Sequence, residues 1–297
     1  MSTELKVPIK NGVYAIIISY FGKTDVIKCI YALKDQLEAV VVIDNGSDAN
    51  SLELLRDLEL KKIIFLIELG ANYGVGYALN RGISYAKSQL ATSILTMDQD
   101  SIADENMVST MLNFKKESFR SDIVATSPYL LLSGVKKINQ KMLETSKVDF
   151  AITSGNLLPI SIFDNIGFFD ENLFIDGVDF DFCYRLKLKG IKLYKVSGAV
   201  LHHNLGEIVS FKLPFYSFDI TIHGPTRRYY LFRNHLYLIS RYFMQLPIPL
   251  IKKSAYEFLL LTQILLFEKS KINNIKMIYL GAVDFLKGVE GRFSHKL

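Results

Sequence analysis

The sequence predicts an α/β fold, with a mostly parallel sheet flanked by helices and a helical segment at the C-terminal end. The first half of the chain alternates short β-branched apolar runs with helical stretches, which is typical of βαβ units. Charged or glycine-rich turns follow these runs, where the carboxyl ends of parallel strands are expected. Hydrophobic residues make up 49% of the 297 residues and charged residues 22%, which excludes a disordered chain, a collagen-like fibre and a disulfide scaffold.

The first hundred residues contain the clearest strand and helix patterns. The apolar run over 13–20 is continuous, as in a strand buried on both faces. Further strands are predicted at 39–43, 62–67 and 93–97, and helices at 24–37, 52–58 and 77–90.

The pattern changes near residue 123. Strands are predicted at 123–128, 148–154, 191–196 and 199–202, with a short helix at 181–189 that Gly190 stops. After about residue 226 the chain is typical of helices rich in Leu, Ile, Tyr and Phe, broken by Pro247 and Pro249. We therefore divide the chain into a body over 1–225 and a C-terminal helical segment over 226–297.

Charge is unevenly placed along the chain, although the net charge is only +5. Residues 211–297 carry 13 basic and 5 acidic side chains. This basic third indicates either an anionic partner, such as phosphates or a membrane surface, or simply an uneven solvated surface. No block of like charges occurs, so nucleic acid is not expected as a partner.

The two cysteines, Cys29 and Cys183, are too few for a disulfide framework or a zinc site. Together with the lack of a recognisable secretory signal, they predict a cytoplasmic location. The best apolar run, Phe258 to Phe267, is ten residues long, whereas a membrane-spanning helix needs about 20. We expect the protein to contact a membrane surface at most.

The triplet Asp98-Gln99-Asp100 directly follows a predicted buried strand. Two carboxylates at a strand end can bind one hard cation, Mg²⁺ or Mn²⁺, which then shares its ligands with substrate phosphates. The alternative is a turn that favours Asp, followed by Ser101 as a helix cap.

Two other strand ends carry polar residues that could meet a nucleotide. Asp44, in the turn after the second strand, could accept the imide N–H of a uracil or thymine ring, although an Asn-Gly turn alone would explain the pattern. Asn72, Gly74 and Gly76 lie in a loop that could bring backbone close to a nucleotide. The loop lacks the full GxGxxG spacing, which disfavours a Rossmann dinucleotide site.

Acidic, histidine and arginine clusters occur in the second half. Residues 170–185 interleave acids with Phe and Ile, and an apolar setting can raise a carboxyl pKa towards that of a general base. Asp181 and Arg185 have the spacing of a helical ion pair. His202-His203 follows a strand and could bind metal or phosphate. Arginines near 227–233 suit a diphosphate, or else belong to the packing of a helix.

Taken in order, these segments resemble the inverting glycosyltransferases of family 2, and more narrowly their bacterial dTDP-rhamnosyltransferase branch. The match runs from about 13 to 240 and is carried by IIISY at 16–20, VIDNGS at 42–47, NYGVGYALNRG at 72–82, MDQDS at 97–101, TSG at 153–155, LFIDGVD at 173–179 and RYYLFRN at 228–234. The resemblance implies the GT-A nucleotide-sugar-binding fold, with a nucleotide-binding half at 1–101 and an acceptor and base half at 102–225.

The resemblance also implies residue roles. Asp179 would be the general base that deprotonates the acceptor hydroxyl. The Glu that usually precedes this Asp is Val178 here, which leaves Asp176 as the rival base. Metal ligands would be Asp98, Asp100 and His203, with His202 as the alternative histidine, and the acceptor would contact Ser154 and Gly155. The nucleotide sugar would contact Ser19, Tyr20, Asp44, Asn72, Gly74, Asp98, Gln99, Arg228 and Arg233.

The implied activity is transfer of rhamnose from dTDP-rhamnose to a lipid-linked surface glycan, with Mg²⁺ or Mn²⁺, at the inner face of the plasma membrane. Alternatives are another donor, such as UDP-galactose or UDP-glucose, and a non-catalytic sugar-nucleotide-binding scaffold. A glycoside hydrolase is disfavoured because the strand-end motifs indicate a nucleotide. The C-terminal helices would contact the membrane, pack on the catalytic domain or form a homodimer.

Overall fold

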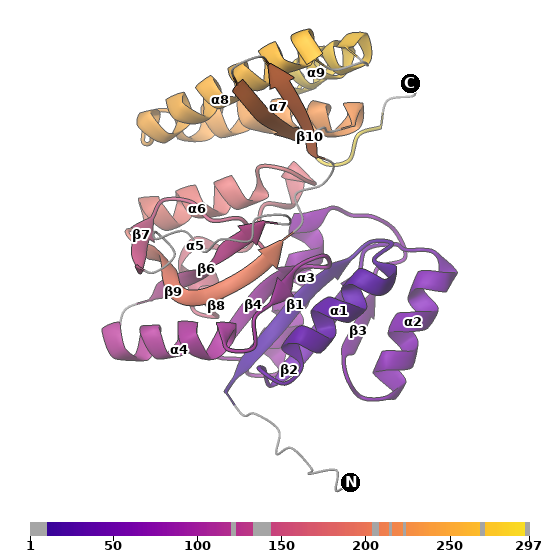
Figure 1. The fold of residues 1–297 in the computed structure, drawn as a ribbon, viewed down its shortest axis with the longest axis vertical. Helices are drawn as coiled ribbons and strands as arrows, with labels where there is room; N and C mark the ends of the chain where they lie inside the picture. The colour runs from indigo at the N-terminus through magenta and orange to yellow at the C-terminus, as the bar shows by residue number, and fades with distance from the viewer. Residues whose placement is uncertain are drawn as a thin grey trace, which may run out of the picture.

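The computed structural model describes residues 11–119, 123–132, 144–203, 208–213, 216–221, 224–267 and 271–294. In these residues one nine-stranded sheet runs through the body of the molecule, with strand order β3-β2-β1-β4-β8-β6-β9-β5 and β7 beside β9. Helices cover both faces of the sheet, and three C-terminal helices form a further layer at the top of Figure 1.

The first half of the sheet is parallel, as predicted. Its elements are β1 (Val13–Ser19), α1 (Lys23–Leu33), β2 (Ala39–Asp44), α2 (Ala49–Leu60), β3 (Phe65–Glu68), α3 (Val75–Ser88) and β4 (Ser93–Asp98). The register pairs Ser19 with Asp44 and Ile18 with Asp98. The acidic residues that end β2 and β4 therefore lie at the same edge of the sheet, on either side of β1.

The second half of the sheet is mixed, so the prediction of a mostly parallel sheet holds only for the first four strands. Strand β8 is antiparallel to both β4 and β6, while β6 and β9 are parallel. The elements are β5 (Ile102–Ala103), α4 (Met107–Ser118), β6 (Val124–Leu132), β7 (Ser146–Val148), β8 (Asn156–Pro159), α5 (Ile162–Ile166), the 3₁₀ turn η2 (Glu171–Leu173), α6 (Val178–Leu188) and β9 (Lys192–His203).

Two strand predictions in this half are wrong. The strand predicted at 148–154 is replaced by β7 and β8, which flank it, and Gly155 bends the chain at φ +86°. The two strands predicted at 191–196 and 199–202 are one strand, β9. The β6–β9 register shifts between Ser127 and Tyr129, and Gly198 has a φ of +77°. A bulge at this glycine therefore lets the strand continue where the sequence suggests a break.

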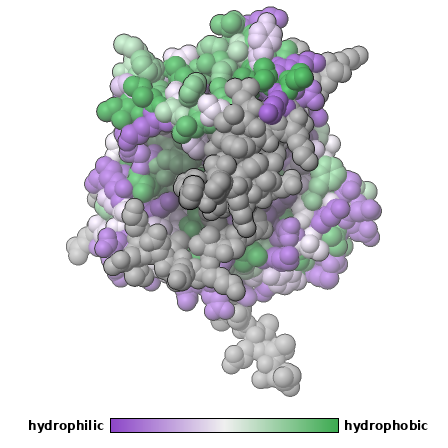
Figure 2. Space-filling model, turned by 45° about the horizontal axis from the view of Figure 1, so that its top comes forward, coloured by the Kyte–Doolittle hydropathy of each residue, from purple (hydrophilic) through white to green (hydrophobic). Residues whose placement is uncertain are grey.

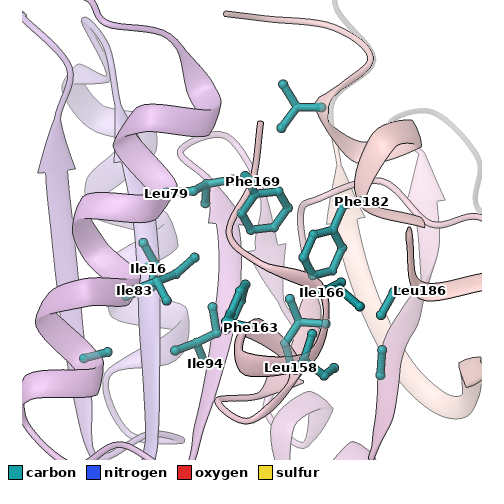
Figure 3. Close-up of a cluster of buried hydrophobic side chains, with 14 of the residues drawn as sticks. Ile16, Leu79, Ile83, Ile94, Leu158, Phe163, Ile166, Phe169, Phe182 and Leu186 are labelled. Atoms are coloured by element: carbon teal, nitrogen blue, oxygen red, sulfur yellow. The ribbon is translucent and has the colours of Figure 1, made fainter. Parts of the chain in front are cut away.

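Two apolar cores lie on the two faces of the sheet. Alternate residues of β1 supply them: Ile16 faces α3, whereas Ile17 faces the side with α1, α2 and α4. Figure 3 shows the first core, where Leu79 and Ile83 of α3 lie on one side of Phe163 and Phe169 and the side chains of α6 on the other. Phe169 stacks on Phe182 with ring centroids 4.3 Å apart. This core fastens α6, and with it the acidic segment, to the parallel half of the sheet.

The C-terminal helices are α7 (Pro225–Tyr242), α8 (Pro247–Phe267) and α9 (Lys271–Leu286). Pro247 and Pro249 lie in the first turn of α8, where the missing N–H groups are tolerated, so they separate α7 from α8 without breaking α8. None of the helices in the described part of the chain is both long and apolar enough to cross a membrane. Ahead of α7, β10 (Ile208–Leu213) and β11 (Tyr216–Thr221) form an antiparallel hairpin that was not predicted.

Gly82 explains part of the glycine motif at 72–82. It lies on the buried face of α3 against β1, and a Cβ placed on it would be 2.3 Å from Cγ2 of Ile16 and 3.3 Å from Cδ1 of Ile43. The residue is therefore required for helix–sheet packing rather than for contact with a ligand.

We expect Gly82→Val to lower the free energy of unfolding by about 3 kcal/mol, because the extra atoms overpack the core. Chemical denaturation measures the change. Gly224→Ala is the control, since no atom of the described residues lies within 4 Å of a Cβ placed there and its φ is negative. It should cost at most about 1 kcal/mol, because alanine is a poorer N-cap residue than glycine. Equal effects of the two substitutions would contradict this account.

Candidate functional site

Three of the predicted metal ligands come together at the carboxyl edge of the sheet. One ligand atom each from Asp98, Asp100 and His203 lies within 4.8 Å of the others. Burial raises the pKa of Asp98 to about 6; the neighbouring His203 opposes the rise and Asp100 adds to it. Two carboxylates and an imidazole suit a divalent ion such as Mn²⁺ or Mg²⁺. This group could therefore hold a divalent metal.

The two adjacent histidines are separated by the alternation of strand β9. His203 Nδ1 lies 2.8 Å from Ser101 Oγ and 4.0 Å from Asp100 Oδ1. His202 instead pairs with Asp104, with Nε2 and Oδ1 2.7 Å apart. Successive side chains of a strand point to opposite faces, so only His203 can join the cluster.

Ser154 supports this loop from beneath. Its Oγ accepts a hydrogen bond from the backbone N–H of Asp98 at 3.0 Å and donates to Ser101 Oγ at 2.8 Å. Ser154 is 1% exposed, and the neighbouring Gly155 is also buried, its N–H donating to the carbonyl of Thr96. Both residues therefore support the loop at 98–101 and the end of β4, and their predicted contact with the acceptor stays a prediction.

Asp44 is fully buried at the end of β2. Its Oδ2 accepts hydrogen bonds from the backbone N–H groups of Gly46 and Ser47, at 3.1 and 3.0 Å. Its Oδ1 has no hydrogen-bond partner among the described residues, and neither has the buried Oγ of Ser19 beside it. A buried acceptor of this kind is costly unless a ligand satisfies it, so Asp44 has the spare acceptor that an imide N–H requires.

The loop after β3 has a structural explanation. Asn72 Oδ1 accepts hydrogen bonds from the Gly74 N–H and the Asn45 amide, as in an Asx turn. Gly74 has a φ of +93°, and a Cβ there would lie 2.5 Å from the carbonyl oxygen of Phe174. Asn72 and Gly74 thus bring the start of α3 against the segment that leads to the acidic residues of α6. Their predicted contact with the nucleotide remains a prediction.

Gln99 lies between Asp98 and Asp100 in the sequence, and its side chain hydrogen-bonds to the backbone of Tyr20. Its Oε1 accepts from the Tyr20 N–H at 2.8 Å, and its Nε2 donates to the Tyr20 carbonyl at 3.1 Å. The next residues are strained, with φ of 52° at Phe21 and 42° at Lys23. The amide of Gln99 therefore holds the loop after β1, on which Tyr20 is 45% exposed. The predicted contact of Gln99 with the nucleotide stays a prediction.

Asp176 lies in a short left-handed segment ahead of α6. Its φ is +59°, and Gly177 follows at +86°. Arg227, at the start of α7, donates to both carboxylate oxygens of Asp176 at 3.0–3.2 Å. Burial alone would lower the pKa of Arg227, but Asp176, Asp98 and Asp179 raise it and keep the guanidinium charged. Arg227 therefore faces an acidic centre that contains Asp176, Asp179 and Asp98, the last of which belongs to the candidate metal site.

Asp179 lies in the first turn of α6. Burial raises the pKa of its carboxyl to about 6, opposed by the hydrogen bond from the Phe180 N–H and assisted by the charge of Asp176. At neutral pH such a group is ionised yet far more basic than an ordinary aspartate, which suits proton acceptance. Because Arg227 holds both oxygens of Asp176, Asp179 is the better placed of the two candidates.

The two arginines predicted to bind the donor are both buried in α7. Arg233 is fully buried; its guanidinium donates to the Tyr229 hydroxyl, the Asn234 side chain and the Gly291 carbonyl, and stacks on two tyrosine rings. Arg228 is 3% exposed. Both side chains lie among the buried residues of α7, and their predicted contact with the donor stays a prediction. Arg227 belongs to the arginine-rich stretch at 227–233, but the sequence assigns it no role of its own. Its position one residue before the buried face of α7 is the signal that could have identified it.

The structure resembles solved glycosyltransferases over most of its length. Against the crystal structure of S. aureus TarS 1–349 in complex with UDP-GlcNAc the TM-score is 0.64 at 14% identity, covering 93% of this chain and 81% of that one. The structure of TarS 1–349 without a named ligand gives 0.63 at 15%. At these identities the likeness shows the fold alone, and that fold is GT-A, the nucleotide-sugar-binding fold of glycosyltransferases.

The sequence places the chain more closely. The profile of glycosyl transferase family 2 matches residues 14–170, and the chain belongs to that family; it is a glycosyltransferase. A dTDP-rhamnosyl transferase, RfbF of Shigella flexneri, is 29% identical over 295 residues, covering 95% of this chain and 97% of the relative. A low-salt glycan biosynthesis hexosyltransferase, Agl10 of Haloferax volcanii, is 25% identical over 210 residues, covering 64% of this chain and 66% of the relative. The resemblance stated from the motifs is confirmed.

The contacts of Gln99 generate a prediction about donor affinity. Gln99→Leu keeps the side-chain size but loses both hydrogen bonds to Tyr20, so the loop after β1 should loosen. We expect the dissociation constant of the nucleotide to rise about tenfold, the equivalent of one to two hydrogen bonds, with the melting temperature nearly unchanged.

Titration calorimetry measures this affinity. Gln99→Glu is the matched variant, because it keeps an acceptor for the Tyr20 N–H and should lose less affinity than Gln99→Leu. Unchanged affinity in Gln99→Leu would show that the loop after β1 does not contact the nucleotide.

Proposed function

We propose that the protein transfers L-rhamnose from dTDP-rhamnose, with inversion, to a lipid-linked intermediate of a cell-surface polysaccharide. The similarity to the Shigella flexneri dTDP-rhamnosyl transferase carries the proposal, because it extends over 97% of that relative and includes both halves of the site. The lipid-linked acceptor comes from the sequence resemblance and is the finer part of the proposal.

Donor binding is assigned to the carboxyl edge of the parallel strands. The free Oδ1 of Asp44 would accept the imide N–H of thymine, and Ser19 would supply a neighbouring hydroxyl. Asp98, Asp100 and His203 fit a divalent ion by donor type and spacing. Mg²⁺ or Mn²⁺ held there would neutralise the charge that develops on the departing diphosphate.

Acceptor activation is assigned to Asp179. Its carboxylate would take the proton of the acceptor hydroxyl as the oxygen attacks the anomeric carbon, while the bond from that carbon to the diphosphate oxygen breaks. Arg227 faces the same centre, and its fixed positive charge would stabilise the negative charge of the departing diphosphate. Asp176 orients Arg227 through the bidentate ion pair.

A second donor class has an observation in its favour. TarS, which shares the fold, is solved with UDP-GlcNAc and with UDP, so a UDP-sugar such as UDP-galactose or UDP-glucose is the alternative. Asp44 does not discriminate between the two bases, because uracil and thymine carry the same imide. A non-catalytic sugar-nucleotide-binding scaffold is the alternative of another class. A degraded Asp-x-Asp triplet or an absent base would have favoured it, and Asp98, Asp100 and Asp179 are all present.

Donor identity and metal dependence can be tested together. We expect dTDP-rhamnose with Mn²⁺ to raise the melting temperature more than UDP- or GDP-sugars, because a ligand that binds only the folded state stabilises it. Asp100→Ala should abolish the metal-dependent part of the shift while leaving the unliganded protein folded.

The control is the same series in excess EDTA. A larger shift with a UDP-sugar would replace the donor in this proposal, and full transfer activity in EDTA would remove the metal from it.

The choice of base generates a prediction with a pH dependence. Asp179→Asn should lower turnover about 10²-fold or more, with nucleotide affinity nearly unchanged. Since the carboxylate must be ionised to accept a proton and burial raises its pKa to about 6, the turnover of the unaltered enzyme should fall about tenfold per pH unit below about 6.

Asp176→Asn is the matched variant and should act through Arg227, raising donor KM more than it lowers turnover. The fold disfavours the charged form of Asp179, so Asp179→Asn should not lower the melting temperature. An inactive Asp176→Asn beside an active Asp179→Asn would reverse the assignment of the base.

A further inference from the structure

Helices α8 and α9 each expose a stripe of large apolar side chains. On α8 the stripe consists of Ile248, Ile251, Tyr256, Phe258 and Leu259, and on α9 of Ile272, Ile275, Tyr279 and Leu286; these residues are 45–82% exposed. On α9 successive members are three, four and seven residues apart, and on α8 the five residues lie within about half of the helix circumference at about 100° per residue, so each stripe occupies one helix face. Figure 2 shows hydrophobic side chains gathered at the top of the molecule, over this layer. Patches of this kind mark interaction surfaces.

The exposed charged side chains of α8 and α9 are positive wherever the side chains of these helices are described. Where α8 and α9 have described side chains, the exposed charged residues are Lys252, Lys271 and Lys276. The acids on these helices face inward: Glu257 is 9% exposed and pairs with Lys253 at 2.8 Å, and Asp284 is 1% exposed. Among the described side chains of α8 and α9, the exposed charges beside the apolar stripes are therefore positive.

We propose that this α8–α9 face binds the surface of an anionic lipid bilayer. Apolar side chains would enter the interfacial region while the lysines meet acidic headgroups, the arrangement of helices that lie in a membrane surface. A second copy of this chain fits the face less well, because a two-fold contact would bring like patches together and set lysines of both copies in one apolar interface.

The opposite side of α8 faces the catalytic half. Lys253 Nζ lies 4.2 Å from the ring centroid of Phe180, the residue that follows Asp179, and that ring stacks on Phe150 at 4.1 Å. One helix thus separates the apolar face from the neighbourhood of the proposed base. A bilayer on α8 and α9 would hold a lipid-linked acceptor near Asp179; this consequence rests on the proposed function, whereas bilayer binding does not.

Co-sedimentation of the purified full chain with vesicles tests the proposal. We expect binding to vesicles of phosphatidylglycerol and phosphatidylethanolamine at low salt, weaker binding in high salt, and little binding to phosphatidylcholine alone. The double variant Lys252→Glu, Lys276→Glu should weaken binding at least about tenfold. Lys116→Glu with Lys189→Glu changes net charge equally on other faces and should bind like the parent.

The apolar contribution is tested in the same way. Ile251→Ser with Phe258→Ser should weaken binding, because both side chains are exposed on α8 and lose only their contact with lipid. Leu60→Ser is the control, since Leu60 is 83% exposed at the end of α2. Far-ultraviolet circular dichroism and the melting temperature check that each variant folds.

Absence of binding to anionic vesicles at low salt would overturn the proposal, as would equal losses in the control variants. A stable dimer that Ile251→Ser with Phe258→Ser disrupts, without vesicle binding, would assign the face to a second copy instead. The assay needs no donor, so thermal shifts with dTDP-rhamnose or UDP-sugars report separately on the proposed function.

Discussion

The segment at 172–176, which leads from η2 towards α6 and ends at Asp176, depends on side chains of α7 for partners of its backbone carbonyl groups. The amide nitrogen of Asn234 lies 2.7 Å from each of the carbonyl oxygens of Leu173, Ile175 and Asp176. The guanidinium of Arg233 is within 3.4 Å of the carbonyls of Asn172 and Leu173. Buried carbonyls need such partners, and the left-handed residues Phe174 and Asp176 persist only where their surroundings hold them.

This anchoring connects the two halves of the site. Phe174 accepts a hydrogen bond from the Val75 N–H at the start of α3, and the Asn80 side chain exchanges hydrogen bonds with the backbone of Phe169. The acidic segment is therefore held between α3, which belongs to the nucleotide-binding half, and α7. The position of Asp179 relative to Asp98 follows from these contacts, not from the sheet alone.

Electrostatics sets a second constraint on the same centre. Asp98, Asp100, Asp176 and Asp179 gather around it, and burial raises the pKa of Asp98 and Asp179 to about 6. Arg227 and His203 counter the negative charge at Asp98, and Lys253 counters it at Asp179. A site of this composition favours a cation, while a general base benefits from the same surplus of negative charge. The arrangement thus suits both cation binding next to the donor and proton acceptance from the acceptor.

The sequence alone determined the parallel strands, because continuous β-branched runs are buried on both faces, and it placed Asp44 and Asp98 at their carboxyl ends. It also identified the family, and it singled out the Asp98-Gln99-Asp100 triplet and Asp179 as candidate site residues. Only the tertiary structure decided between His203 and His202, through the alternation of β9. It added Arg227, which pairs with Asp176, to the predicted Arg228 and Arg233, and it showed that Gln99, Ser154 and Gly155 support neighbouring loops. These outcomes depend on which way a side chain points and what lies opposite it across tens of residues, and local sequence patterns carry no such information.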